Sequence, residues 1–154
     1  MNSELRIYLQ NHEAAGRAGL DLFRRTAKSH QRRSYGPELA ALCSEIDEDL
    51  SRLREILRER GGRLNVPLGV ALQVGERIGR LKPNGRVIRR SPLSDLLEVE
   101  ALQDAVHAKR AGWLALAAAQ IDTERVPDLI ERADDQIARL EVIHAEVAGQ
   151  VLEG

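Results

Sequence analysis

Four segments of the chain repeat apolar side chains at the spacing of an α-helix, and proline or glycine stands at most of the segment boundaries. The segments start at Ser3, at Gly36-Pro37, at Ser91-Pro92 and between Asp122 and Pro127. The first ends near Ser29, and Gly61-Gly62 ends the second, as glycine commonly does after a helix. This pattern predicts an all-α chain of four long helices, with Ser3 as the N-cap of the first.

The apolar stripe of each segment predicts which helix face lies in the core. In the second segment the stripe is Leu39, Leu42, Cys43, Ile46, Leu50, Leu53 and Leu57. In the third, the expected core residues include Leu93, Leu96, Leu97 and Leu114. The single tryptophan, Trp113, anchors either the core or an interface, and we favour the core. A chain of 154 residues can bury such a core as one domain over residues 1–154.

The connection between the second and third segments is much longer than the others, since it runs from Arg63 to Arg90. A helix of this kind spans about 40 Å, so the connection is long enough to run back along a bundle. The expected result is an up-down-down-up order, which is the order of ferritin-like four-helix bundles with one crossover. We also expect a short helix from about Leu68 to Leu81 within this insert.

Composition argues against several classes of function. Charged residues make up 31% of the chain, the net charge is −1 and 3% of residues are aromatic, so neither nucleic acid nor a membrane is an expected partner. The start of the chain lacks the basic and apolar regions of a secretory signal, and the longest nearly apolar stretch, Gly112 to Ile121, is far shorter than the roughly 20 residues that span a bilayer. One cysteine, Cys43, permits no intrachain disulfide. These features predict a cytoplasmic protein.

Four stretches carry a family resemblance: YLQNHEAAG, SEIDEDLSRL, GERIGRLKPNG and LLEVEALQDAVHAKRAGWLAL. As a set they resemble a group of uncharacterised small bacterial helical proteins with a ferritin-like bundle. The resemblance covers most of the chain. It implies the bundle fold and implies no activity.

Two carboxylate–histidine pairs suggest a metal site. Glu141 and His144 lie three residues apart on the fourth segment, and Asp104 and His107 do so on the third, so each pair shares a helix face. Di-metal carboxylate bundles use two such pairs together with single glutamates from the other helices. The candidate ligands here are Glu45, Glu100, Glu141 and His144, and the expected metal is iron or manganese.

The placement of these pairs differs from the ferritin-like arrangement, which has them on the second and fourth helices. Counting 1.5 Å per residue places His144 with Glu45 and Glu100 at one level of the bundle, and a second polar cluster roughly 15 Å away. The second cluster is His12, Asp49, Asp104 and His107. The alternative that we favour is a buried salt-bridge network, in which Arg52 and Lys109 neutralise the carboxylates of the second helix and His12 hydrogen-bonds to Asp49.

A basic run ends the long insert, and it includes Arg86, Arg89 and Arg90. Such a run can bind an anionic ligand, or it can be a solvated loop that pairs with nearby acidic residues such as Asp95 and Glu98. The first segment carries a patch of small residues, Ala14, Ala15, Gly16, Ala18 and Gly19. This patch permits close helix packing within the chain or a two-fold dimer contact.

Three functional interpretations follow. The leading one is a non-catalytic bundle that acts as an assembly or interaction protein and self-associates as a homodimer or a larger oligomer. The second is a di-metal carboxylate protein that oxidises or stores iron or manganese. The third is an anionic-ligand binder at the insert. Whether the chain is an enzyme stays open among them.

Overall fold

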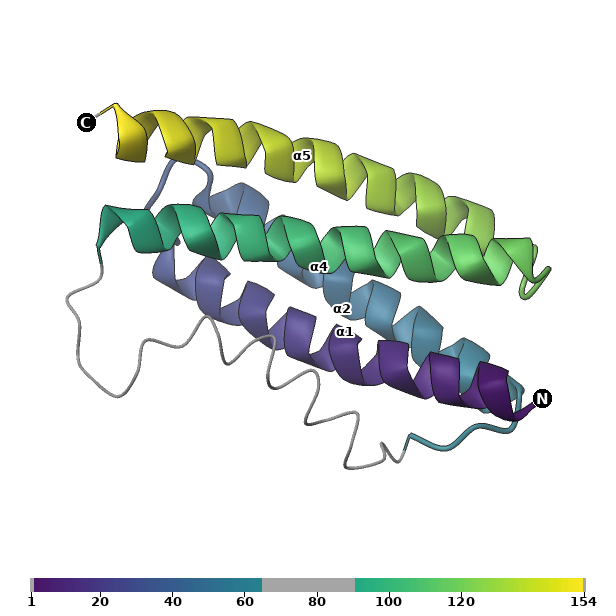
Figure 1. The fold of residues 1–154 in the computed structure, drawn as a ribbon. Coiled ribbons are helices and arrows are strands. Elements are labelled where there is room, and N and C mark those ends of the chain that lie inside the picture. Colours follow the sequence, from purple (N-terminus) through teal and green to yellow (C-terminus); the bar gives the residue numbers. More distant parts are fainter. Residues whose placement is uncertain (1, 65–90, 154) are drawn as a thin grey trace.

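The computed structural model describes residues 2–64 and 91–153, and these residues fold into a bundle of helices without a strand (Figure 1). The helices are α1 (Ser3–Ser29), α2 (Gly36–Glu59), α4 (Pro92–Ala118) and α5 (Val126–Leu152). The prediction of an all-α chain with four long helices at these boundaries is confirmed for the described residues. The predicted short helix at 68–81 lies outside them.

The helices pack side by side in antiparallel pairs (Figure 1). Backbones approach closely between α1 and α2, between α4 and α5, and between α1 and α4. Long polar side chains join α2 to α5, and their pairs follow one another in opposite order along the two helices: Glu59 with Arg125, Glu48 with Arg132 and Glu38 with Arg139. The C-terminal end of α1 meets the N-terminal end of α4, since Nε2 of His30 lies 3.7 Å from Oδ1 of Asp95.

Apolar residues from all four helices form one core cluster. The predicted stripe of α2 is largely confirmed, because its leucines and Ile46 are buried and Cys43 is half-buried. Trp113 is buried as predicted.

The predicted core face of α4 is wrong in part. Leu93, Leu97 and Leu114 are 50%, 46% and 41% exposed. The buried residues of this helix are Leu96, Val99, Leu102, Val106, Trp113 and Leu116, together with Asp95 and Gly112. Apolar residues occur on several sides of α4, so their spacing alone did not select the buried side.

Particular residues at the ends of α1 and α2 account for where these helices begin and end. The N-cap of α1 is Asn2, whose Oδ1 accepts a hydrogen bond of 2.8 Å from the backbone N–H of Leu5, so the prediction of Ser3 as N-cap is wrong. Gly61 follows α2 with a φ of 75°, a conformation that glycine adopts at little cost. At Gly36, a Cβ atom would lie 2.8 Å from the carbonyl oxygens of His30 and Gln31, so only glycine fits this turn.

The small-residue patch of α1 packs within the chain. A Cβ at Gly16 would lie 2.9 Å from Leu50 of α2, and one at Gly19 would lie 3.7 Å from Ala105 of α4. The small side chains thus allow α1 to approach two neighbouring helices closely. Of the two interpretations of this patch, the structure shows intrachain packing.

Candidate functional site

A buried aspartate forms the centre of a polar network in the middle of the bundle. Asp49 of α2 has a side chain that is 0% exposed, and the ammonium group of Lys109, from α4, donates a hydrogen bond to its Oδ2. Lys109 also donates to the amide oxygen of Gln136, a fully buried residue of α5. Three helices therefore meet at hydrogen bonds among three polar side chains. Burial lowers the pKa of Lys109, while the charge of Asp49 acts to raise it.

The network continues along α2 and α5. The amide nitrogen of Gln136 donates to Oδ2 of Asp49 at 3.2 Å and to Oε2 of Glu45 at 3.1 Å. The guanidinium of Arg139 donates to both oxygens of Glu45, at 2.8 and 3.0 Å. Arg132 lies 3.5 Å from Oδ1 of Asp49. We call these residues the central ion network: Glu45, Asp49, Lys109, Arg132, Gln136 and Arg139.

Arg139 is held by carboxylates on both helices. It also pairs with Glu38, and its contact with Asp135 is 2.9 Å. Burial lowers the pKa of Arg139, but hydrogen bonds to Glu38, Glu45 and Asp135 outweigh burial and raise the pKa above its usual range. The cation therefore stays charged beside Glu45.

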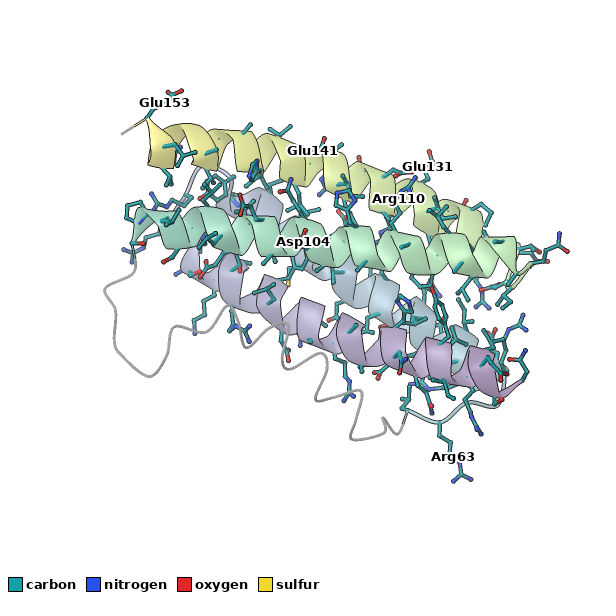
Figure 2. All side chains as sticks on the ribbon, viewed as in Figure 1. Arg63, Asp104, Arg110, Glu131, Glu141 and Glu153 are labelled. Carbon is teal, nitrogen blue, oxygen red and sulfur yellow. The ribbon has the colours of Figure 1, made fainter. Side chains whose placement is uncertain are left out.

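The four residues predicted as metal ligands are not brought together. Nε2 of His144 lies 3.3 Å from Oε1 of Glu100, on the partly exposed surface between α5 and α4. Glu45 is instead bound by Arg139 and Gln136 in the central ion network. Glu141 is exposed on α5 (Figure 2). The structure thus shows one histidine–glutamate contact and no single group of the four.

The second predicted polar cluster is also dispersed. Asp104 and His107 are exposed on α4 (Figure 2 labels Asp104). The ring of His12 packs on that of Tyr8, with centroids 4.5 Å apart, and lies against Gly112. Burial lowers the pKa of His12. The expected hydrogen bond from His12 to Asp49 is not formed.

The favoured alternative, a buried salt-bridge network, fits what is observed, with different partners from those expected. Lys109 neutralises Asp49 as predicted. Arg52 does not take part, because it pairs with Glu55 on the exposed side of α2. Sequence reasoning missed the cations of α5, Arg132 and Arg139. The signal for them was present, because residues 132, 136 and 139 recur at helical spacing and so share one face.

A second cluster lies where the C-terminal end of α1 meets the N-terminal end of α4. His30 is the residue that follows α1, and its side chain is 1% exposed. Its Nε2 atom lies 2.9 Å from Oε2 of Glu98 and 3.7 Å from Oδ1 of Asp95. One ligand atom from each of the three residues lies within 4.8 Å of the other two. We call His30, Asp95 and Glu98 the His30 cluster.

Two further side chains orient the His30 cluster. Nδ1 of His30 lies 2.9 Å from the hydroxyl of Tyr35, which is buried. Arg33 donates to Oδ2 of Asp95 at 2.6 Å, so Oδ1 is the oxygen that faces the imidazole. The sequence around His30 is polar and basic, and no pattern in it marks His30 as a site residue. Sequence reasoning missed the cluster because about 65 residues separate the histidine from the carboxylates in sequence.

The predicted anion-binding residues, Arg86, Arg89 and Arg90, lie outside the described residues. Within residues 2–64 and 91–153, none of the helices combines the length and the apolar character needed to span a bilayer. No family model, no curated protein and no solved structure matches the chain.

Proposed function

We propose that this chain is a non-catalytic helical bundle that acts as an assembly or interaction protein. The observation that carries the proposal is the central ion network, in which the chain's own cations occupy the interior beside the carboxylates. A di-metal centre needs interior carboxylates whose lone pairs face a shared metal position. Here the ammonium of Lys109 contacts Asp49, and the guanidinium of Arg139 contacts Glu45.

Electrostatics supports the same proposal. A metal ion at Glu45 or Asp49 would lie beside Lys109, Arg132 or Arg139, and like charges at such short range repel strongly inside a protein. Displacing these cations would also leave Gln136, which is fully buried, without the partner of its amide oxygen. The interior is therefore better suited to a permanent ion network than to a redox metal.

We further propose that the bundle has the ferritin-like up-down-down-up order. The support is that α1 is antiparallel to α2, through Glu13 with Arg54 and Arg24 with Asp47, and also antiparallel to α4. Helices α2 and α4 then run in the same direction and need a long crossover.

The surface proposed for self-association is an apolar stripe on the outer face of α5. It consists of Ala138, Val142, Ala145, Gly149 and Leu152. Val142 and Leu152 are 69% and 70% exposed, and a side chain at Gly149 would meet no atom within 4 Å. Small residues let two copies of a helix approach closely across a two-fold axis. The small residues of α1 have the same effect within the chain, where they let α2 and α4 approach α1 closely. The expected partner is a second copy of this chain.

The catalytic part of the proposal is tested by adding ferrous iron anaerobically and then admitting oxygen. We expect no oxygen consumption above that of the buffer with iron. Sustained consumption that is lost in Glu45→Gln would overturn the proposal, because it would place a working metal beside Glu45.

The assembly part is tested by sedimentation velocity across a range of concentrations. We expect a dimer for the wild-type chain and a monomer for Val142→Arg. The matched control is Leu114→Arg, which adds the same charge at an exposed leucine of α4 and is expected to remain dimeric. A monomeric wild-type chain at all concentrations, or a dimer that survives Val142→Arg, would refute this surface.

A further inference from the structure

The His30 cluster combines one imidazole and two carboxylates from helices that are distant in sequence. Asp95 and Glu98 lie three residues apart in the first turns of α4, so both side chains leave the same face of that helix. His30 reaches them from the end of α1, where the chain turns toward α2. Arg33, which lies in the same turn as His30, pairs with Oδ2 of Asp95.

We propose that the His30 cluster binds one divalent transition-metal ion, such as Zn²⁺ or Mn²⁺, through Nε2 of His30 and one oxygen each of Asp95 and Glu98. In sites with metal–ligand bonds of about 2.0–2.2 Å, neighbouring ligand atoms lie roughly 3.0–3.5 Å apart. The observed separations from Nε2, 2.9 Å to Glu98 and 3.7 Å to Asp95, bracket that range. Small side-chain adjustments would therefore suffice to admit the ion.

Tyr35 can hydrogen-bond to the imidazole of His30 both without and with a bound metal ion. In the neutral imidazole without metal, if Nε2 carries the proton it donates to Glu98, and the hydroxyl of Tyr35 then donates to Nδ1. With metal, Nε2 gives its lone pair to the ion, and Nδ1–H donates to the oxygen of Tyr35, because a hydroxyl can donate or accept. Such a partner on the second ring nitrogen is what metal-binding histidines usually have. Tyr35 is thus a positioning residue.

Charge and access also favour a cation. The two carboxylates carry the negative charge that attracts a cation, and Arg33 holds Oδ2 of Asp95. His30 and Asp95 are buried, with side chains 1% and 7% exposed, whereas Glu98 is 32% exposed and gives the ion a route from solvent. A bound ion would tie the end of α1 to the start of α4. This structural role does not depend on the proposed function.

The mixed ligand set defines the metal class. Imidazole favours transition metals over Ca²⁺ and Mg²⁺, whereas the carboxylates admit Mn²⁺ as well as Zn²⁺. Three protein ligands leave room for water, which is compatible with four or more coordination positions.

The test measures binding of Zn²⁺ and Mn²⁺ to the metal-free full chain by equilibrium dialysis, together with the thermal midpoint. We expect one ion per chain and a higher midpoint with metal. Glu98→Gln keeps the size of a partly exposed side chain and is expected to fold. It should bind at least tenfold more weakly, because an amide oxygen is a poorer ligand than a carboxylate. His30→Gln should abolish binding.

Two control variants distinguish the loss of a metal ligand from a general loss of folded structure. Tyr35→Phe should lower affinity by about 10- to 100-fold while one ion per chain still binds, since it removes only the partner of Nδ1. His144→Gln removes the exposed histidine that contacts Glu100 and should leave binding unchanged. The proposal is overturned if neither ion binds, or if folded Glu98→Gln retains wild-type affinity.

Discussion

Replacing Lys109 with methionine is expected to lower the free energy of unfolding by about 3 kcal/mol. Methionine keeps an unbranched side chain of similar length but lacks the ammonium group. Asp49, whose side chain is 0% exposed, would then lose the cation that donates to its Oδ2. Gln136 would lose the donor to its amide oxygen at the same time.

The magnitude follows from the burial of the pair. Removing one partner of a buried ion pair costs about 3–5 kcal/mol. The lower end applies here, because Arg132 at 3.5 Å and the amide nitrogen of Gln136 at 3.2 Å remain in contact with Asp49. In a domain of this size each kcal/mol corresponds to about 2–4 °C, so the thermal midpoint should fall by about 6–12 °C.

The assay is urea denaturation followed by circular dichroism and by the fluorescence of Trp113. Asp49→Asn combined with Lys109→Met should be more stable than Lys109→Met alone, because the buried charge is then gone. The control is Arg52→Met, which breaks an exposed pair with Glu55 and should change stability by less than about 0.5 kcal/mol. A loss below about 1 kcal/mol for Lys109→Met, or a double variant no more stable than that single variant, would refute the reasoning.

Three further predictions concern other parts of the bundle. Burial lowers the pKa of His12, so the unfolded chain binds the proton more readily, and stability should fall as pH drops below about 6.5; urea midpoints measured on both sides of that pH should differ less in His12→Gln. Asn2→Ala should cost about 1 kcal/mol by removing the N-cap of α1, whereas Ser3→Ala should have a smaller effect in the same denaturation assay. Gly36→Ala should cost about 1–3 kcal/mol because its Cβ would clash with the carbonyl oxygens of His30 and Gln31. At a concentration where the chain is monomeric, Gly149→Ala should be neutral or stabilising, because its Cβ would meet no atom of its own chain within 4 Å; equal thermal midpoints for the two variants would contradict this.

The sequence predicted helix boundaries well because proline and glycine act locally. Gly36-Pro37 and Pro92 stand in the first turns of α2 and α4, and Gly61 adopts the positive φ that ends α2. The core face was predictable where polar and apolar sides differ, as in α2. It was not predictable in α4, where Leu93 and Leu97 are as apolar as the buried Leu96.

The candidate site was harder to predict because its contacts depend on helix rotation and on distant residues. Spacing paired Glu141 with His144, but Glu141 is exposed and His144 contacts Glu100. The partners of Asp49 come from α4 and α5, and no local pattern connects them. His30 meets its carboxylates only because the end of α1 lies beside the start of α4.

The polar contact between α2 and α5 has a structural consequence beyond neutralising charge. An apolar interface between two helices tolerates displacement by one turn, which is about 5.4 Å. In this bundle such a displacement of α5 would separate Gln136 from Asp49, Glu45 and Lys109, and would leave the fully buried amide of Gln136 without its partners. The central ion network therefore specifies the register of α5 against α2, in the way that a buried polar residue specifies register in a coiled coil. Packing specificity is thus a sufficient physical reason for the charged groups of the central ion network.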